Sequence, residues 1–96
     1  PNAEKIDPLR KFSARYLNIA TSLRRQDAPP KYEKSIYAWT DAVATYGTSL
    51  WDFAQAMEQR DVDAMTSKGK KISDAFEDVN NKFAPLSSAY HDQCAK

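Results

Sequence analysis

The chain has little glycine, cysteine or histidine: two glycines, one cysteine and one histidine in 96 residues. So few glycines argue against a β-sandwich or β-barrel, which needs many tight turns. Cys94 has no second cysteine for an internal disulfide, and no Cys-x-x-Cys or His-Glu-x-x-His spacing supplies metal ligands. His91 is expected on the surface near the C-terminus. We therefore predict no metal site and no cofactor.

Long apolar runs are also missing. No stretch of about 18 apolar residues exists, so no membrane-spanning helix is expected. The chain begins at Pro1 without a methionine or the apolar core of a signal peptide, as in a processed product or an excised domain. With 42% hydrophobic and 28% charged residues, we expect a soluble globular domain whose compartment the sequence does not indicate.

An unbroken apolar repeat dominates the middle of the chain. Its members are spaced by alternating fours and threes: Tyr32, Ile36, Trp39, Val43, Tyr46, Leu50, Phe53 and Met57. This spacing is typical of an amphipathic helix packed at coiled-coil-like angles. It predicts a helix over residues 30–59, about 45 Å long. Gly47, inside this helix, is expected to mark a close approach of a second helix.

The same repeat predicts one helix on each side of the central one. Asp7 as N-cap and Pro8 at the first position predict a first helix over 8–25. Asp61 as N-cap predicts a third helix over 61–83 that continues, kinked by Pro85, to about residue 92. Short connections make neighbours antiparallel. The expected fold is all-α, a single domain over 1–96: an antiparallel three-helix bundle with a short first helix, a long central helix and a Pro-kinked third helix.

A short first helix would leave one tip of the bundle only two helices thick. Exposed apolar patches usually mark a contact with a partner. Tyr and Trp off the main repeat are favoured at interface centres. The candidate interface residues are Tyr37, Leu50, Trp51, Phe53, Met57 and Met65. The alternative is that residues 1–7 extend the first helix and close this gap.

Charge is unevenly distributed although the formal net charge is only +1. Residues 1–34 hold eight basic and four acidic side chains, whereas residues 35–66 hold one basic and five acidic. Either a basic helix lies beside an acidic one within the bundle, or the first third meets an acidic partner or an anionic membrane. The run Lys68, Lys70 and Lys71 is a candidate anion contact, with a solvated helix face as the alternative. The basic excess is too small to favour nucleic acid.

No motif in the sequence carries catalytic chemistry. There is no glycine-rich phosphate loop and no nucleophile elbow around a serine. The carboxylates fall outside the apolar repeat, where they stay solvated instead of acting as buried acids or bases. We predict that the protein is not an enzyme.

Two resemblances accompany these patterns. Ile6-Asp7-Pro8-Leu9-Arg10 resembles the opening of the small all-helical chorismate mutases, which implies a small helical enzyme as one alternative. Those enzymes gather several arginines and a lysine on a dicarboxylate, whereas the apolar repeat here is uninterrupted. The run Tyr46 to Leu50 followed by Phe53-Ala54 resembles the long helices of membrane-bending BAR-type domains. That resemblance implies a peripheral module that binds anionic lipid through the basic first third.

The favoured interpretation is a helical module for protein–protein interaction or self-association. Its expected partner is a second protein or a second copy of this chain. An anionic membrane is the alternative partner.

Overall fold

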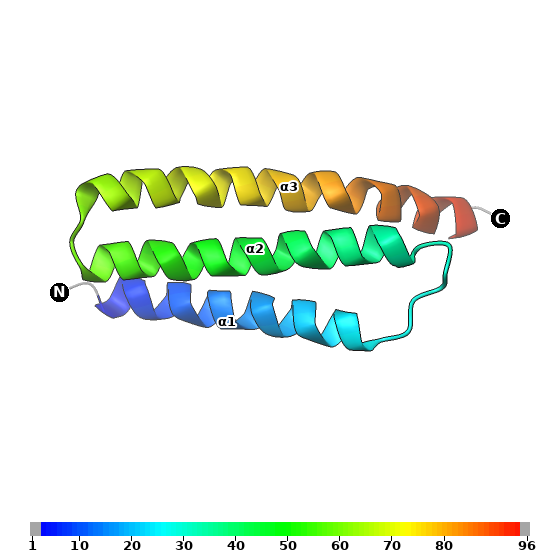
Figure 1. Ribbon diagram of the computed structural model, residues 1–96, viewed down its shortest axis with the longest axis horizontal. Coiled ribbons are helices and arrows are strands. Elements are labelled where there is room, and N and C mark those ends of the chain that lie inside the picture. The colour runs from blue at the N-terminus through cyan, green and yellow to red at the C-terminus, as the bar shows by residue number, and fades with distance from the viewer. Residues whose placement is uncertain (1–2, 95–96) are drawn as a thin grey trace.

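The structure, a computed structural model, describes residues 3–94 and the side chains of residues 4–88. This part of the chain holds three helices and no strand: α1 (Ala3–Arg25), α2 (Glu33–Glu58) and α3 (Val62–Cys94). They run up, down and up with α2 in the middle (Figure 1). The predicted all-α fold of three antiparallel helices is confirmed. The side chains of His91 and Cys94 lie outside the described residues.

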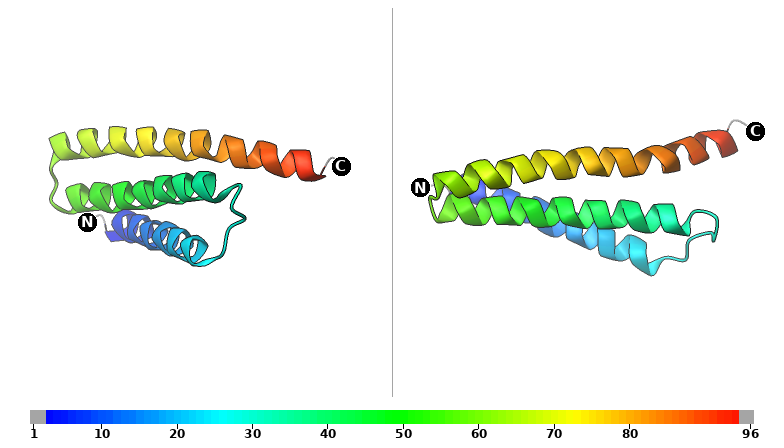
Figure 2. Two further views of the ribbon diagram at one scale, coloured as in Figure 1. Left: turned by 45° about the vertical axis from the view of Figure 1, so that its right-hand side comes forward. Right: turned by 45° about the horizontal axis from the view of Figure 1, so that its top comes forward.

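The arrangement is open because the outer helices pack only on α2. Within the described residues, no Cα atom of α1 lies within 8 Å of one in α3. The molecule measures 53 × 22 × 20 Å, and α1 crosses α2 obliquely (Figure 2). Each outer helix therefore keeps one side uncovered by the rest of the chain.

The expected short first helix and long central helix are wrong, since α1 has 23 residues and α2 has 26. α1 begins at Ala3 because Ile6, only 7% exposed, is buried where α1 packs on α2. Asp7 is thus inside the helix and is not its N-cap. Pro8 is tolerated there: the amide it lacks would have bonded the carbonyl of Glu4, an exposed residue in the first turn. The alternative that residues before 8 extend the first helix is confirmed.

α2 begins three residues later than predicted. Residues 30–32 form a turn in which the Tyr32 amide donates to the Pro29 carbonyl at 2.9 Å. Because a proline disfavours the α conformation in the residue before it, Pro30 restricts Pro29, and the chain completes a turn before Glu33 starts the helix.

The join between α2 and α3 is a C-terminal helix cap followed directly by an N-cap. Arg60 has φ 56°, its amide donates to Met57 at 3.1 Å, and the Asp61 amide donates to Ala56 at 3.1 Å. This is the Schellman pattern. The Asp61 carboxylate then accepts from the Ala64 amide at 3.0 Å, which confirms Asp61 as the N-cap of α3.

α3 runs through Pro85 as one helix from Val62 to Cys94. The chain therefore keeps its direction across Pro85, as expected from the apolar repeat on both sides of it. The kink at this proline stays a prediction.

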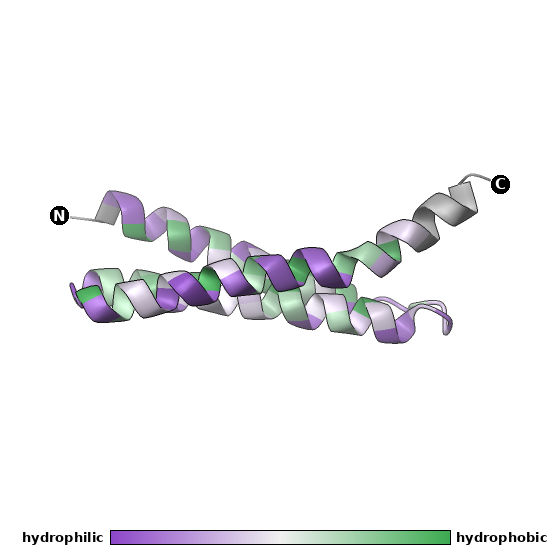
Figure 3. Ribbon diagram, turned by 90° about the horizontal axis from the view of Figure 1, so that it is seen from above, coloured by the Kyte–Doolittle hydropathy of each residue, from purple (hydrophilic) through white to green (hydrophobic). Residues whose placement is uncertain are grey.

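Every helix has both hydrophilic and hydrophobic positions (Figure 3). Small residues form most of the core. The buried apolar residues are Ile6, Ala20, Ala42, Val43, Leu50, Ala54, Ala56 and Ala75. Gly47 lets α1 approach closely: a Cβ there would lie 3.2 Å from the Ser13 carbonyl oxygen and 3.2 Å from Leu17 Cγ. The close helix approach predicted at Gly47 is confirmed. Since small side chains bring the backbones together, several large ones are left at the surface.

Candidate interaction surface

Two arginines of α1 hold it to α2 along one side. Arg10 pairs with Glu58 at 2.7 Å, donates to Gln55 at 2.9 Å and lies 4.8 Å above the ring of Trp51. Between the two arginines, the buried Ser13 hydroxyl donates to the Gly47 carbonyl at 2.6 Å. This side of α1 is used within the chain.

Arg24 repeats the arrangement fourteen residues later. It donates to Thr40 Oγ1 at 2.8 Å, pairs with Asp41 and lies 4.8 Å above the ring of Tyr37. A basic helix thus lies beside an acidic one, as one of the two interpretations of the charge pattern expected. Tyr37 and Trp51, predicted as interface candidates, both pack under arginines of the same chain.

The other predicted interface residues lie in or near the core. Leu50 is buried, and Phe53, Met57 and Met65 are half-buried. Phe53 lies against α3, 3.6 Å from where a Cβ on Gly69 would be. Contact of these residues with a partner stays a prediction.

Lys68, Lys70 and Lys71, predicted as an anion contact, do not form one free basic patch. Lys70 pairs with Asp74 at 3.1 Å, and Lys68 is half-buried. Lys71 borders a shallow depression of about 350 Å³ between α2 and α3 together with three carboxylates, those of Asp52, Asp74 and Asp78. An anion would meet negative charge beside each of Lys70 and Lys71.

A continuous set of rings crosses the molecule from α1 to α3. Tyr16 meets Tyr46 edge-on at 5.1 Å between ring centroids, and Tyr46 meets Phe76 at 5.7 Å. Trp39, seven residues before Tyr46 in α2, pairs with Phe83, seven residues after Phe76 in α3, at 5.6 Å between ring centroids. These contacts place one side of all three helices on a common face.

The outer residues of this face are exposed. Phe12 and Ile19 flank Tyr16 at helical spacing on α1 and are 47% and 40% exposed. Phe76 and Phe83 on α3 are 53% and 47% exposed. We call the surface made by Phe12, Tyr16, Ile19, Tyr46, Phe76 and Phe83 the aromatic face. It holds four of the six large hydrophobic side chains that are exposed among the described residues.

Tyr46 lies at the centre of the aromatic face. Burial, and to a smaller extent the neighbouring Tyr16, raises the pKa of the Tyr46 phenol above its ordinary value. The phenol therefore stays neutral at physiological pH, and Tyr46 acts as an apolar floor with one polar tip.

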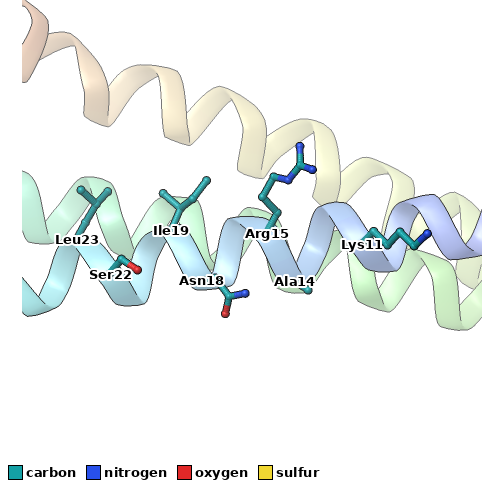
Figure 4. Close-up of a pocket in the computed structure, with 7 residues that line it drawn as sticks. All are labelled: Lys11, Ala14, Arg15, Asn18, Ile19, Ser22 and Leu23. Carbon is teal, nitrogen blue, oxygen red and sulfur yellow. The ribbon is translucent and has the colours of Figure 1, made fainter.

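A shallow depression of about 550 Å³ borders the aromatic face along α1 (Figure 4). Its ridge consists of Lys11, Arg15, Ile19 and Leu23, spaced four residues apart. The shorter Ala14, Asn18 and Ser22 line its other side. In Figure 4 Arg15, Ile19 and Leu23 leave α1 on the side where α3 passes.

α1 carries several cations, two of them on the ridge, that form no salt bridge among the described side chains. Among the described side chains, Lys5, Lys11, Arg15 and Arg25 form no salt bridge, and Arg15 lies 5.9 Å above the Phe12 ring. No acidic residue lines the depression. Positive charge and apolar surface therefore meet along this edge of α1.

Other kinds of site find little support in the described part of the chain. No group of three or more His, Cys, Asp and Glu residues there is placed to hold a metal ion. Of the helices described, none combines the length and the apolar character that crossing a bilayer requires. Comparison with models of known families, with curated proteins and with solved structures finds no significant match.

The sequence did not single out the exposed aromatic residues. Phe12, Ile19, Phe76 and Phe83 belong to the same three-four repeats as half-buried positions such as Tyr16 and Val79, so their pattern predicts a core. What exposes them is the separation of α1 from α3, a property of the assembled helices. The nearest signal in the sequence is Arg15, which is charged and lies between Phe12 and Ile19.

Proposed function

We propose that this protein is a non-enzymatic helical module that binds another protein through its aromatic face. The observation that carries the proposal is the exposure of Phe12, Ile19, Phe76 and Phe83 on helices whose outer two, within the described residues, have no Cα atoms within 8 Å of each other. Domains normally cover the apolar side of one helical layer with a second layer. A partner would supply that layer here.

The polar organisation of the opposite edges supports this assignment. Arg10 and Arg24 hold α1 to α2 away from the aromatic face, so the Tyr16–Tyr46 contact within that face is not the only link between the two helices. A partner could bind this face or leave it without breaking the ion pairs of Arg10 and Arg24, which suits reversible binding.

Site-specific photo-crosslinking tests the proposal. A photoreactive residue in place of Phe76 is expected to cross-link a second polypeptide in cells that make the protein. The same residue in place of Thr48, which lines the depression between α2 and α3, is the control and should not. Cross-links from Thr48 alone, or from neither position, would contradict the proposal.

A membrane-associating module is the second candidate, favoured by the unpaired cations Lys5, Lys11, Arg15 and Arg25. Basic residues near anionic lipid give binding that falls steeply with salt. Pelleting with vesicles rich in phosphatidylserine tests this candidate. The absence of salt-sensitive binding would remove it.

A further inference from the structure

We propose that the aromatic face and the cationic ridge of α1 bind an amphipathic helix of another protein that carries acidic residues along one border. This inference rests on the proposed function and specifies the chemistry of the partner. The occupant would lie beside α1 on the side of α3, as the fourth helix of a bundle.

The shape of the surface suits a helix. Arg15, Ile19 and Leu23, each one turn apart, leave α1 on the side of α3, whereas Asn18 leaves it on the opposite side (Figure 4), so these three side chains form a row along α1. Helices pack by placing such a row of one into the channel of the other. The rings of Tyr16, Tyr46 and Phe76 continue the apolar surface toward α3.

The charge of the surface selects the partner. Arg15 and Lys11 stand on the ridge, one and two turns from Ile19, without a salt bridge among the described side chains. The exposed positions of α3 that continue its aromatic row are uncharged: Val62, Thr66, Ser73, Phe76, Asn80 and Phe83. An occupant therefore meets cations on its α1 border, whereas the charged residue next to Phe76 on α3 is the exposed acid Glu77. Carboxylates along a single border complement this distribution.

Four carboxylates of a second copy are already paired within its own chain. Asp41 and Glu58 of α2 are paired with α1, while Asp74 and Asp78 of α3 are paired with lysines of their own helix. The α1 helix of a second copy would also bring its own Lys11 and Arg15 to the contact. Its Glu4, Asp63 and Glu77 form no salt bridge among the described side chains, so a second copy is the competing occupant that the sedimentation runs below test.

A phage-displayed library of amphipathic helical peptides tests the inference. Every member keeps an apolar stripe at positions i, i+3, i+4 and i+7, and the flanking positions are randomised. Selection on the intact 96-residue chain is expected to enrich Asp and Glu on one flank only. Enrichment of neutral or basic residues on both flanks, or no enrichment at all, would overturn the inference.

Charge reversal supplies the sharper comparison. In Lys11→Glu/Arg15→Glu, affinity for a selected peptide should fall about tenfold, and selection should now enrich Lys and Arg on that flank. Lys70→Glu/Lys71→Glu changes the net charge equally on α3 and should bind as the wild type does. Equal losses in both double variants would overturn the inference in favour of a general charge effect.

Three further outcomes separate this inference from the proposed function or overturn it. Peptides selected without charge preference but lost on Phe76→Glu would overturn the acidic partner and leave the aromatic face as a binding surface. A chain that dimerises in sedimentation runs and loses the dimer in Phe12→Glu would show a second copy as the occupant and would overturn the inference. If phosphatidylserine vesicles bind and no peptide is selected, the inference is overturned and a membrane is the occupant.

Discussion

At the scale of single residues, the two glycines have opposite roles although both lie inside helices. A Cβ on Gly47 would have three neighbours of α1 within 3.2 to 3.3 Å, one of them a backbone oxygen. A Cβ on Gly69 would meet only Phe53, at 3.6 Å. Gly47 therefore permits the close contact between α1 and α2. An alanine at position 69 would fit without a clash.

Alanine substitutions should therefore change stability in opposite directions. Gly69→Ala is expected to raise the free energy of unfolding by about 1 kcal/mol, the usual helix preference of alanine over glycine. Gly47→Ala should lower it by about 1 kcal/mol, because crowding against Ser13 and Leu17 exceeds that gain. Urea unfolding of both variants and the wild type measures the difference. A stabilised Gly47→Ala would contradict the close packing of α1 on α2.

Tyr46 predicts a loss of stability in alkaline solution. Its pKa is raised in the folded chain above 10.0, the ordinary value that it regains on unfolding. The folded state then binds the proton more tightly, so stability is unaffected below about pH 10 and falls as the pH rises through the folded pKa.

Comparing unfolding of the wild type and Tyr46→Phe from neutral pH to above pH 10.0 isolates this effect from the titration of the lysines. The stability difference between the two proteins should shift in favour of the variant only in the alkaline range. A constant difference across the series would show that Tyr46 titrates alike in both states.

At the scale of elements, the join between α2 and α3 combines a favourable cap with a strained residue. Arg60 takes φ 56°, a left-handed conformation that costs a non-glycine residue about 1 kcal/mol, whereas Asp61 caps α3. Arg60→Gly should therefore stabilise the chain by about 1 kcal/mol, and Asp61→Ala should destabilise it by about 1 kcal/mol. Thermal unfolding of both variants checks this, and a destabilised Arg60→Gly would refute the strain at Arg60.

The three helices could be predicted from the sequence, but their first and last residues could be predicted only in part. The three-four repeats predicted all three elements, and the side chain of Asp61 predicted the start of α3 within one residue. Asp7 and Pro8 were misleading because an N-cap pattern is local. The burial of Ile6 on α2, which extends α1 to Ala3, is a tertiary effect.

At the scale of the whole molecule, the candidate surface could not be predicted from the repeats. They placed Phe12, Ile19, Phe76 and Phe83 in a core that a closed bundle would have. Small residues at the helix contacts, such as Ala20, bring α1 and α3 onto α2 and not onto each other. Sequence periodicity shows which side of a helix is apolar but not whether another helix of the chain covers it.

The exposure of the aromatic face predicts that polar substitutions on it cost little stability. Phe76→Glu should change the free energy of unfolding by less than about 1 kcal/mol, because that ring is half in solvent. Leu50→Ala, in the buried core, should cost about 3 kcal/mol. Urea unfolding compares them. A large loss in Phe76→Glu would mean that the ring is part of the core.

The central claim is that the aromatic face and the adjoining ridge of α1 receive a helix from another protein. Its most direct measurement is a titration of a selected acidic peptide into the isotope-labelled chain, followed by nuclear magnetic resonance. The account predicts the largest shifts at Phe12, Arg15, Ile19, Tyr46 and Phe76. Shifts concentrated around Thr45, Thr48 and Lys71, in the depression between α2 and α3, would contradict it.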